Sequence, residues 1–217
     1  MKAGEKVDKD NMEDKENKRF VIVVGRQFGS GGHDMAVKLA ERLGVQFYDN
    51  RLISEAAGKM GYSPEIFRRI DEKRPSFLRS LLSFTYGTQS APPETAMSGE
   101  HLYGAQAAAI KEIAARESCV IVGRTADYVL RDHPGLLSIF VNAPMEFRIK
   151  NVMSRENCDA EAAESLIRKK DRDREAFYNY YTNRSWGHAD NYHLCFDASR
   201  MDADRILPLI RQLLHLN

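Results

Sequence analysis

A strand-like apolar run that leads through a glycine-rich turn into a helix is the feature that most constrains how this chain can fold. Val21–Val24 is a continuous run of β-branched residues, and residues 25–32 (GRQFGSGG) form the turn. Apolar residues at helical spacing come next, namely Ala36, Leu39, Ala40 and Leu43. This order leaves unpaired backbone N–H groups at the positive end of a helix, which favours binding of a polyanion such as a phosphate.

The turn has the position of a P-loop but lacks the residues that end the P-loop motif. The pattern Gly-x4-Gly-Lys-Ser/Thr places a lysine where Gly32 stands and a magnesium-binding hydroxyl where His33 stands. The candidate phosphate-binding residues are therefore Gly29, Ser30, Gly31, Gly32 and His33. The alternative is a glycine-rich turn in another kind of α/β protein that binds no phosphate.

Composition predicts a single core and argues against two classes of partner. The chain has 217 residues, of which 43% are apolar, and this is enough for one well-packed domain over residues 19–217. A net charge of +1 provides no long-range field to attract nucleic acid or an anionic membrane. No apolar run approaches the roughly 18 residues of a membrane span, so we expect a cytoplasmic protein without membrane attachment. Residues 1–18, with five positive and six negative side chains, are expected to form a disordered charged tail.

Strand-like runs predict an α/β fold with a parallel sheet. The runs are Phe20–Val24, Val45–Tyr48, Cys119–Val122, Leu137–Val141 and His193–Phe196. Three of them are apolar without alternation, which indicates strands buried on both faces between two layers of helices. About seventy residues separate the second and third runs, far more than one crossover helix needs. We therefore expect an insertion, at about residues 50–116, that forms the substrate domain.

An arginine follows the third strand-like run directly. Arg124 and Asp127 lie just past the carboxyl end of Cys119–Val122, at the edge where open α/β sheets bind ligands. The guanidinium of Arg124 is suited to bidentate contact with a phosphate, and Asp127 could hold it or contact a base or ribose. The alternative is an ion pair that merely fastens the next helix.

A second basic region lies on two expected helices and predicts a lid over about residues 148–175. Its cations include Arg148, Arg155, Lys170 and Arg174, and the last two share a helix face at i, i+4 spacing. The interleaved Asp171 leaves open the alternative of a solvated helix face. The aromatic residues that follow could stack on a nucleobase or pack in the core. The six histidines show no ligand spacing, so we expect no metal site made by the protein alone.

Together, the ordered motifs of the chain resemble the cytidylate kinase-like proteins of the P-loop nucleoside monophosphate kinase superfamily. These motifs are the glycine-rich turn, Phe47-Tyr48-Asp49, Gln106, Val122-Gly123-Arg124, Asp171-x-x-Arg174 and Asn191-Tyr192-x-Leu194-Cys195. The resemblance implies a three-layer P-loop kinase fold, with a five-stranded parallel sheet, a helical monophosphate-binding insertion and a helical lid. It also implies transfer of the γ-phosphoryl group from ATP, with Mg²⁺, to CMP or dCMP, with small nucleotides as the binding partners.

The resemblance also assigns roles to individual residues. Arg124 matches the arginine of the family's Gly-Arg-Asp motif, where Thr125 replaces the aspartate. Asp171 and Arg174 are similar to the family's ribose- and phosphate-contacting pair, and Asp49 falls where the family has Asp-Ser. Phosphoryl transfer depends on neutralisation of charge, and the cations that could supply it are Arg26, Arg124, Arg148, Arg155, Lys170 and Arg174. Of these, the candidate catalytic residues are Arg124, Lys170 and Arg174. Two alternatives remain, which are a nucleotide-binding pseudoenzyme with a regulatory role and a kinase of a non-nucleotide acceptor.

Overall fold

A five-stranded parallel sheet forms the centre of the protein. The computed structural model describes residues 19–59 and 99–216. The strands are β1 (Val21–Arg26), β2 (Gln46–Tyr48), β3 (Cys119–Val122), β4 (Leu136–Asn142) and β5 (Leu194–Asp197). All pairings are parallel, and the order across the sheet is β2-β3-β1-β4-β5. The central position of β1 brings its carboxyl end between those of β3 and β4.

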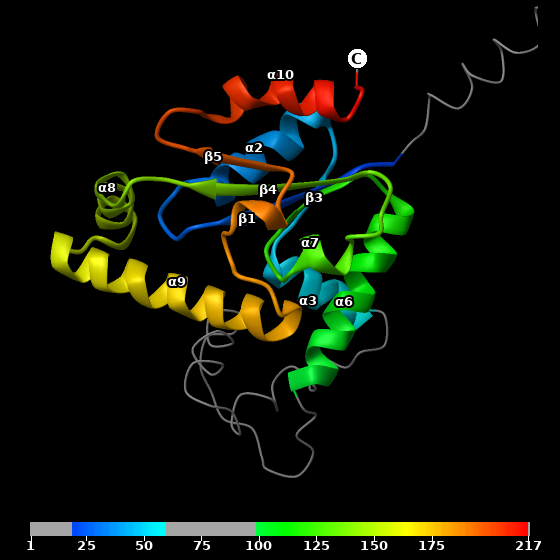
Figure 1. Ribbon diagram of the computed structural model, residues 1–217, viewed down its shortest axis with the longest axis horizontal. Helices are drawn as coiled ribbons and strands as arrows, with labels where there is room; N and C mark the ends of the chain where they lie inside the picture. The colour runs from blue at the N-terminus through cyan, green and yellow to red at the C-terminus, as the bar shows by residue number, and fades with distance from the viewer. Residues whose placement is uncertain (1–18, 60–98, 217) are drawn as a thin grey trace, which may run out of the picture.

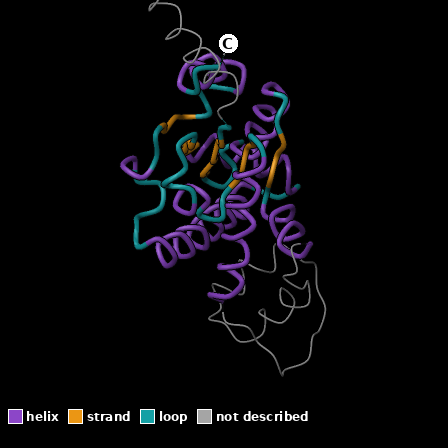
Figure 2. Tube along the Cα trace, turned by 90° about the vertical axis from the view of Figure 1, so that its right-hand side faces the viewer, coloured by secondary structure: helices purple, strands orange, loops and turns teal. Residues whose placement is uncertain are grey.

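Helices cover both faces of the sheet, which gives three layers (Figures 1 and 2). The helices are α2 (Gly32–Leu43), α3 (Asn50–Lys59), α6 (Gly99–Arg116), α7 (Ala126–Val129), α8 (Met145–Glu156), α9 (Ala160–Thr182) and α10 (Ala203–Leu213). A short 3-10 helix, Ala189–Asn191, precedes β5. In Figure 1, α2 and α10 lie above the sheet, while α3, α6 and α7 lie below it.

Alternate residues of β1 belong to two separate cores. Ile22 and Val24 pack with α2 and α10, in a cluster that includes Leu39 and Ile206. Val21 and Val23 pack on the opposite side of the sheet, against α3 and α6. Successive side chains of a strand point to opposite faces, so a strand covered on both sides must be apolar throughout. This confirms the α/β fold with a five-stranded parallel sheet that the apolar runs predict.

Helices α8 and α9 form a third packing unit beside the glycine-rich loop, which we define as residues 27–31. Phe28 of this loop is buried with Val152 of α8 and with Ala163 and Ile167 of α9. The sheet therefore contacts these two helices through the loop as well as through the β4–α8 connection. Figure 1 shows α9 running along one side of the molecule, past the end of the sheet.

Two of the expected segments fall largely outside the described part of the chain. The expected tail at residues 1–18 lies outside it, as do residues 60–98 of the expected insertion. Within the described ranges, the first and last pieces of that insertion are α3 and α6, which pack side by side. Among the helices that the structure describes, none has both the length and the apolar character needed to cross a membrane.

Candidate functional site

The glycine-rich loop turns sharply between β1 and α2 because two glycines adopt left-handed backbone angles. The φ angles of Gly29 and Gly31 are 78° and 81°, a region that residues with a Cβ rarely enter. Their surroundings differ. A Cβ on Gly29 would lie 2.9 Å from the Arg148 carbonyl oxygen, whereas a Cβ on Gly31 would have no neighbour within 4 Å. The loop is thus tightly packed against α8 on one side and open at Gly31.

Four successive carbonyl oxygens at this turn accept hydrogen bonds from side chains. Those of Arg26, Gln27, Phe28 and Gly29 accept from Arg174, Ser30, Arg148 and Asn151, respectively, at 2.9 to 3.4 Å. The negative ends of these peptide dipoles are therefore neutralised by donors, several of which come from α8 and α9. The hydroxyl hydrogen of Ser30 is used inside the loop by this arrangement.

Backbone N–H groups at the start of α2 are left for another partner. Within the described residues, the N–H groups of His33 and Asp34 have no hydrogen-bond acceptor. The N-cap position is occupied by Gly31, which has no side chain to satisfy them. Unpaired donors and the helix dipole both favour an anion at this end of α2.

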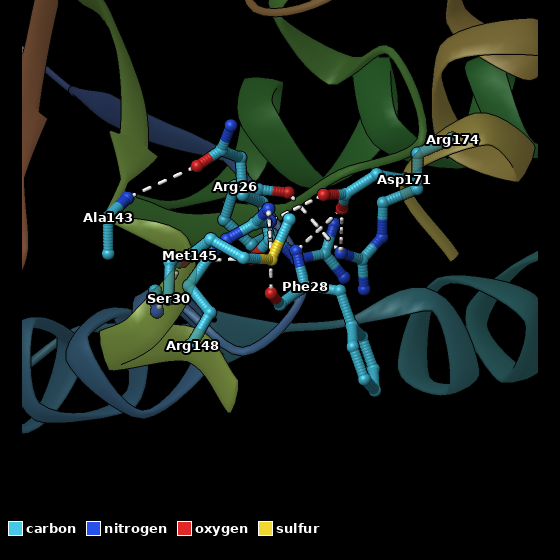
Figure 3. A network of polar contacts seen from close by, with 10 residues as sticks. Arg26, Phe28, Ser30, Ala143, Met145, Arg148, Asp171 and Arg174 are labelled. Atoms are coloured by element: carbon cyan, nitrogen blue, oxygen red, sulfur yellow. Dashed lines mark hydrogen bonds and ion pairs between the residues drawn. The ribbon is translucent and has the colours of Figure 1, made fainter. Parts of the chain in front are cut away.

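A buried ion pair between Arg148 and Asp171 holds the glycine-rich loop in place (Figure 3). Asp171 of α9 accepts a hydrogen bond from the Phe28 N–H at 2.7 Å and also pairs with Nη1 of Arg148. The Arg148 side chain is 6% exposed, and its Nη1 also donates to the Phe28 carbonyl. Arg148 and Asp171, which the sequence suggests as ligand-contacting residues of a lid, therefore contact the loop backbone in this structure.

A cavity of about 390 Å³ opens at the carboxyl edge of the sheet beside the loop. It is lined by residues from the ends of β1, β2 and β3, from the starts of α2, α3 and α7, and from α9. Six of the sequence-predicted site residues line it: His33, Asp49, Arg124, Asp127, Lys170 and Arg174. The others, which are residues 29–32, Arg148, Arg155 and Asp171, lie outside the cavity lining. Its size is in the range of small-molecule sites.

Four arginines line this cavity, of which Arg51 of α3 pairs with Glu55 and the other three come from different elements. Arg26 comes from the end of β1, Arg124 from the turn after β3, and Arg174 from α9. Burial lowers the pKa of Arg26 well below its usual value, and the charges of Arg174 and Arg124 lower it further. Burial also lowers the pKa of Arg174 to about 10, although the nearby Asp171 opposes that shift. Clustered, desolvated cations of this kind are stabilised when an anion lies between them.

Lys170 adds an ammonium group to the cavity lining, one helical turn before Arg174 on α9. Burial lowers the pKa of the Lys170 ammonium to about 8, while Asp173 opposes the shift. Asp173 is itself buried and lines the cavity, a position that the sequence analysis did not assign to it. Lys170 and Asp173 have i, i+3 spacing, which places them on one helix face. That spacing is the sequence signal by which Asp173 could have been assigned to the site.

The turn after β3 holds Arg124 in an unusual backbone conformation. Gly123, Arg124 and Thr125 have φ angles of 77°, 57° and 53° in succession. For a β-branched residue such as Thr125 this angle is strained, and such strain is concentrated at functional sites. The hydroxyl groups of Tyr103 and Thr125 lie 2.9 Å apart, and the Arg124 guanidinium lies 5.3 Å from the Phe177 ring centre. These contacts hold the turn in place.

Asp127 forms a buried polar pair with an aromatic residue of α9. The hydroxyl of Tyr178 donates to Asp127 Oδ2 at 2.7 Å, and both residues line the cavity. Burial raises the pKa of Asp127, while the hydrogen bond from Tyr178 opposes the shift. Tyr192 lies beside Tyr178 with a ring-centre distance of 6.4 Å. The aromatic run is compatible from its sequence with either base stacking or core packing, and Tyr178 is both buried and at the cavity wall.

His33 and Asp49 both line the cavity and lie close to each other. His33 Nε2 lies 3.9 Å from Asp49 Oδ2, and the imidazole packs edge-on against Phe47. Asp49 Oδ1 accepts from the Leu52 N–H at 3.0 Å, which caps the start of α3. Within the described ranges, no group of three or more metal-ligating side chains occurs.

Comparison with known proteins identifies the family. The family model described as the cytidylate kinase-like family matches residues 21–200. The chain belongs to the cytidylate kinase-like family. A cytidylate kinase from Methanopyrus kandleri is 26% identical over 192 residues, which cover 88% of this chain and 91% of that protein. This membership confirms the resemblance seen in the ordered sequence motifs.

Solved structures share the fold of this cytidylate kinase-like protein. An uncharacterized protein from Eubacterium ventriosum is 26% identical, has a TM-score of 0.69, and is matched over 92% of this chain and 100% of its own. A shikimate kinase from Bacteroides thetaiotaomicron is 13% identical, with a TM-score of 0.50 and coverage of 91% and 99%. At that identity the likeness concerns the fold alone, and it supports the expected P-loop kinase fold.

Proposed function

We propose that this protein is a nucleoside monophosphate kinase that transfers the γ-phosphoryl group of ATP to CMP or dCMP. The observation that carries the proposal is the convergence of Arg26, Arg124 and Arg174 on one cavity beside the free N–H groups of α2. Family membership and the cytidylate kinase relative in Methanopyrus kandleri favour a cytidine nucleotide as acceptor.

In this proposal, the two phosphate groups approach each other from different sides of the cavity. The donor phosphates bind along residues 29–33, where the N–H groups of α2 are unpaired. Arg124 binds the acceptor phosphate from the end of β3, since a guanidinium can contact two phosphate oxygens at once. Lys170 and Arg174 lie across the cavity on α9, from which they neutralise the transferring group.

The residues present are compatible with a magnesium ion that is carried in with the nucleotide. Mg²⁺ is usually held by one or two carboxylates together with substrate phosphates and waters, so a dedicated protein cage is unnecessary. Asp49 provides a partly exposed carboxylate at the cavity wall, and Asp173 provides a second. The ion would neutralise charge on the donor phosphates.

The proposal is tested by measuring phosphoryl transfer from Mg·ATP to CMP, dCMP, UMP, AMP, GMP and non-nucleotide alcohols. We expect formation of CDP or dCDP with the highest kcat/KM of the panel. Arg174→Ala should lower kcat at least 100-fold, because the lost charge is most needed in the transition state. Arg168→Ala is the matched control, since Arg168 lies exposed on the same helix and pairs with Glu164. A folded wild type that phosphorylates none of the nucleotides contradicts the proposal.

A further inference from the structure

The Arg26 side chain fits between two glycines that belong to different elements. A Cβ on Gly32 would lie 2.7 Å from Arg26 Cβ, and a Cβ on Gly123 would lie 2.5 Å from Arg26 Nη1. Both distances are shorter than real Cβ contacts, so a side chain at position 32 would collide with the Arg26 stem and one at position 123 would displace its guanidinium. The arginine therefore extends from the first residue of α2 to the turn after β3, through space that glycine leaves open at both ends.

Position 32 is the position at which a P-loop carries its lysine. A lysine there would place its Cβ against the Cβ and Cγ of Arg26, at 2.7 and 3.3 Å. The two cations consequently cannot occupy the site together without a backbone shift. The arginine stem at position 26 and a lysine at position 32 therefore exclude each other in this backbone, and Val141 Cβ, at 3.0 Å, narrows the space at position 32 further.

We propose that Arg26 replaces the missing P-loop lysine and contacts the β- and γ-phosphates of the nucleotide donor. This inference rests on the proposed function and assigns the cation that the altered loop motif lacks. It places that cation on β1, within the same chain segment as the loop, so no movement of α9 is required to supply it.

The charge state of the surroundings supports this role. Within residues 19–59 and 99–216, the Arg26 guanidinium forms no ion pair and no side-chain hydrogen bond, although it lines the cavity. Arg148 differs from Arg26 in this respect, because its guanidinium forms an ion pair with Asp171. Arg174 also pairs with Asp171, at 3.7 Å, and its charge adds to burial in lowering the pKa of Arg26, so two guanidinium groups lie near each other. A bound polyphosphate would offset this repulsion.

The chemical step needs a cation at this place but no proton transfer. The bond between the γ-phosphorus and the β–γ bridging oxygen breaks, and its electron pair stays on ADP. A bond forms between the γ-phosphorus and an oxygen of the acceptor's ionised phosphate. Charge accumulates on the bridging oxygen as the bond breaks, and Arg26 neutralises it there.

The test separates the charge of Arg26 from its volume. Arg26→Met keeps an unbranched stem between the two glycines, Arg26→Lys keeps the charge, and Arg42→Met is the control at an exposed pair with Asp204. We expect Arg26→Met to lower kcat at least 100-fold and to raise the Kd for Mg·ATP about tenfold, with an unchanged Tm. Arg26→Lys should keep both kcat and the Kd for Mg·ATP closer to the wild-type values than Arg26→Met does. Arg42→Met should match the wild type in both.

An exchange variant tests the steric half of the inference. The double variant R26G/G32K moves the cation to position 32 and removes the Arg26 Cβ, which leaves Val141 Cβ, at 3.0 Å, as the neighbour that must shift slightly. Its kcat should be at least tenfold higher than that of R26G alone. The inference is overturned if folded Arg26→Met keeps kcat within threefold and the Kd for Mg·ATP within twofold of the wild type. If the wild type binds Mg·ATP but forms no CDP or dCDP, the proposed function fails, and the Kd alone decides the role of Arg26. A wild type that does not bind Mg·ATP overturns both.

Discussion

The carboxylate of Asp171 accepts a hydrogen bond from the backbone N–H of Phe28 at 2.7 Å, although 143 residues separate them in the chain. This contact ties the glycine-rich loop to α9. Together with the ion pair to Arg148, it means that the shape of the loop depends on two helices that follow β4. In the proposed kinase, any displacement of α9 would therefore alter the loop that receives the donor phosphates.

Asp171→Asn is expected to destabilise the protein substantially. It removes the negative partner of Arg148, whose guanidinium is buried and whose Nε already lacks a hydrogen-bond partner among the described residues. Leaving such a charge uncompensated should lower the free energy of unfolding by about 3 kcal/mol, as measured by urea denaturation. Asp204→Asn, at an exposed pair with Arg42, should change it by less than about 0.5 kcal/mol. Equal small effects of both variants would contradict the anchoring role of Asp171.

Gly29→Ala and Gly31→Ala form a matched pair, because both glycines have positive φ but only one is surrounded by atoms. Left-handed strain alone should cost Gly31→Ala about 1 kcal/mol of unfolding free energy. Gly29→Ala adds collisions with the Arg148 carbonyl and Val152, each at 2.9 Å, so its cost should reach about 3 kcal/mol. Thermal or urea unfolding of the ligand-free variants provides the comparison. Equal losses would mean that the loop is less tightly packed against α8.

Arg124→Lys is expected to weaken binding of the acceptor nucleotide. A lysine cannot reproduce bidentate contact with a phosphate, so the acceptor KM should rise about tenfold, or about 1.4 kcal/mol, while the KM for ATP changes little. Steady-state kinetics with each substrate varied in turn will separate the two. The control is Arg131→Lys, since Arg131 also packs on an aromatic ring, at 4.5 Å from that of Tyr128, but is exposed. A parallel rise in both KM values would assign Arg124 to the structure of the turn instead.

We expect the protein to take up protons from solution when it binds nucleotide near pH 8.5. Burial lowers the pKa of Lys170 to about 8 in the nucleotide-free protein, so much of that protein has a neutral amine at this pH. A phosphate beside Lys170 favours the charged form and raises its pKa, and the complex must therefore bind additional protons. Calorimetry of Mg·ATP binding in buffers of different ionisation enthalpy measures this uptake. Uptake that persists unchanged in Lys170→Met would show that another group is responsible.

Much of the fold was predictable because it depends on local composition. The β-branched run Val21–Val24 is apolar at every position, and only a strand covered on both faces requires that. The helix after the loop was equally visible from its 3.6-residue spacing. The four-residue helix α7 was not expected, since Ala126–Val129 is too short to show a period.

The site was only partly predictable. The positions of Arg124 and Arg174 followed from a strand end and from helix spacing, and both line the cavity. The two members of the Arg148–Asp171 pair, by contrast, have a residue type suited to a ligand but contact the loop. Nothing in the local sequence distinguishes a cation that faces a cavity from one that faces a buried carboxylate.

The sequence by itself therefore determined the order of the strands along the chain, the glycine-rich turn and the set of available charges, because these depend on neighbours within a few residues. The tertiary structure alone decided which charges face the cavity. Arg26 and Gly123 are far apart in the chain, and only the parallel pairing of β1 with β3 brings them together. A Cβ at position 123 would lie 2.5 Å from Arg26 Nη1, so the guanidinium keeps its present place only because that residue is glycine, and this steric condition arises only in the folded sheet.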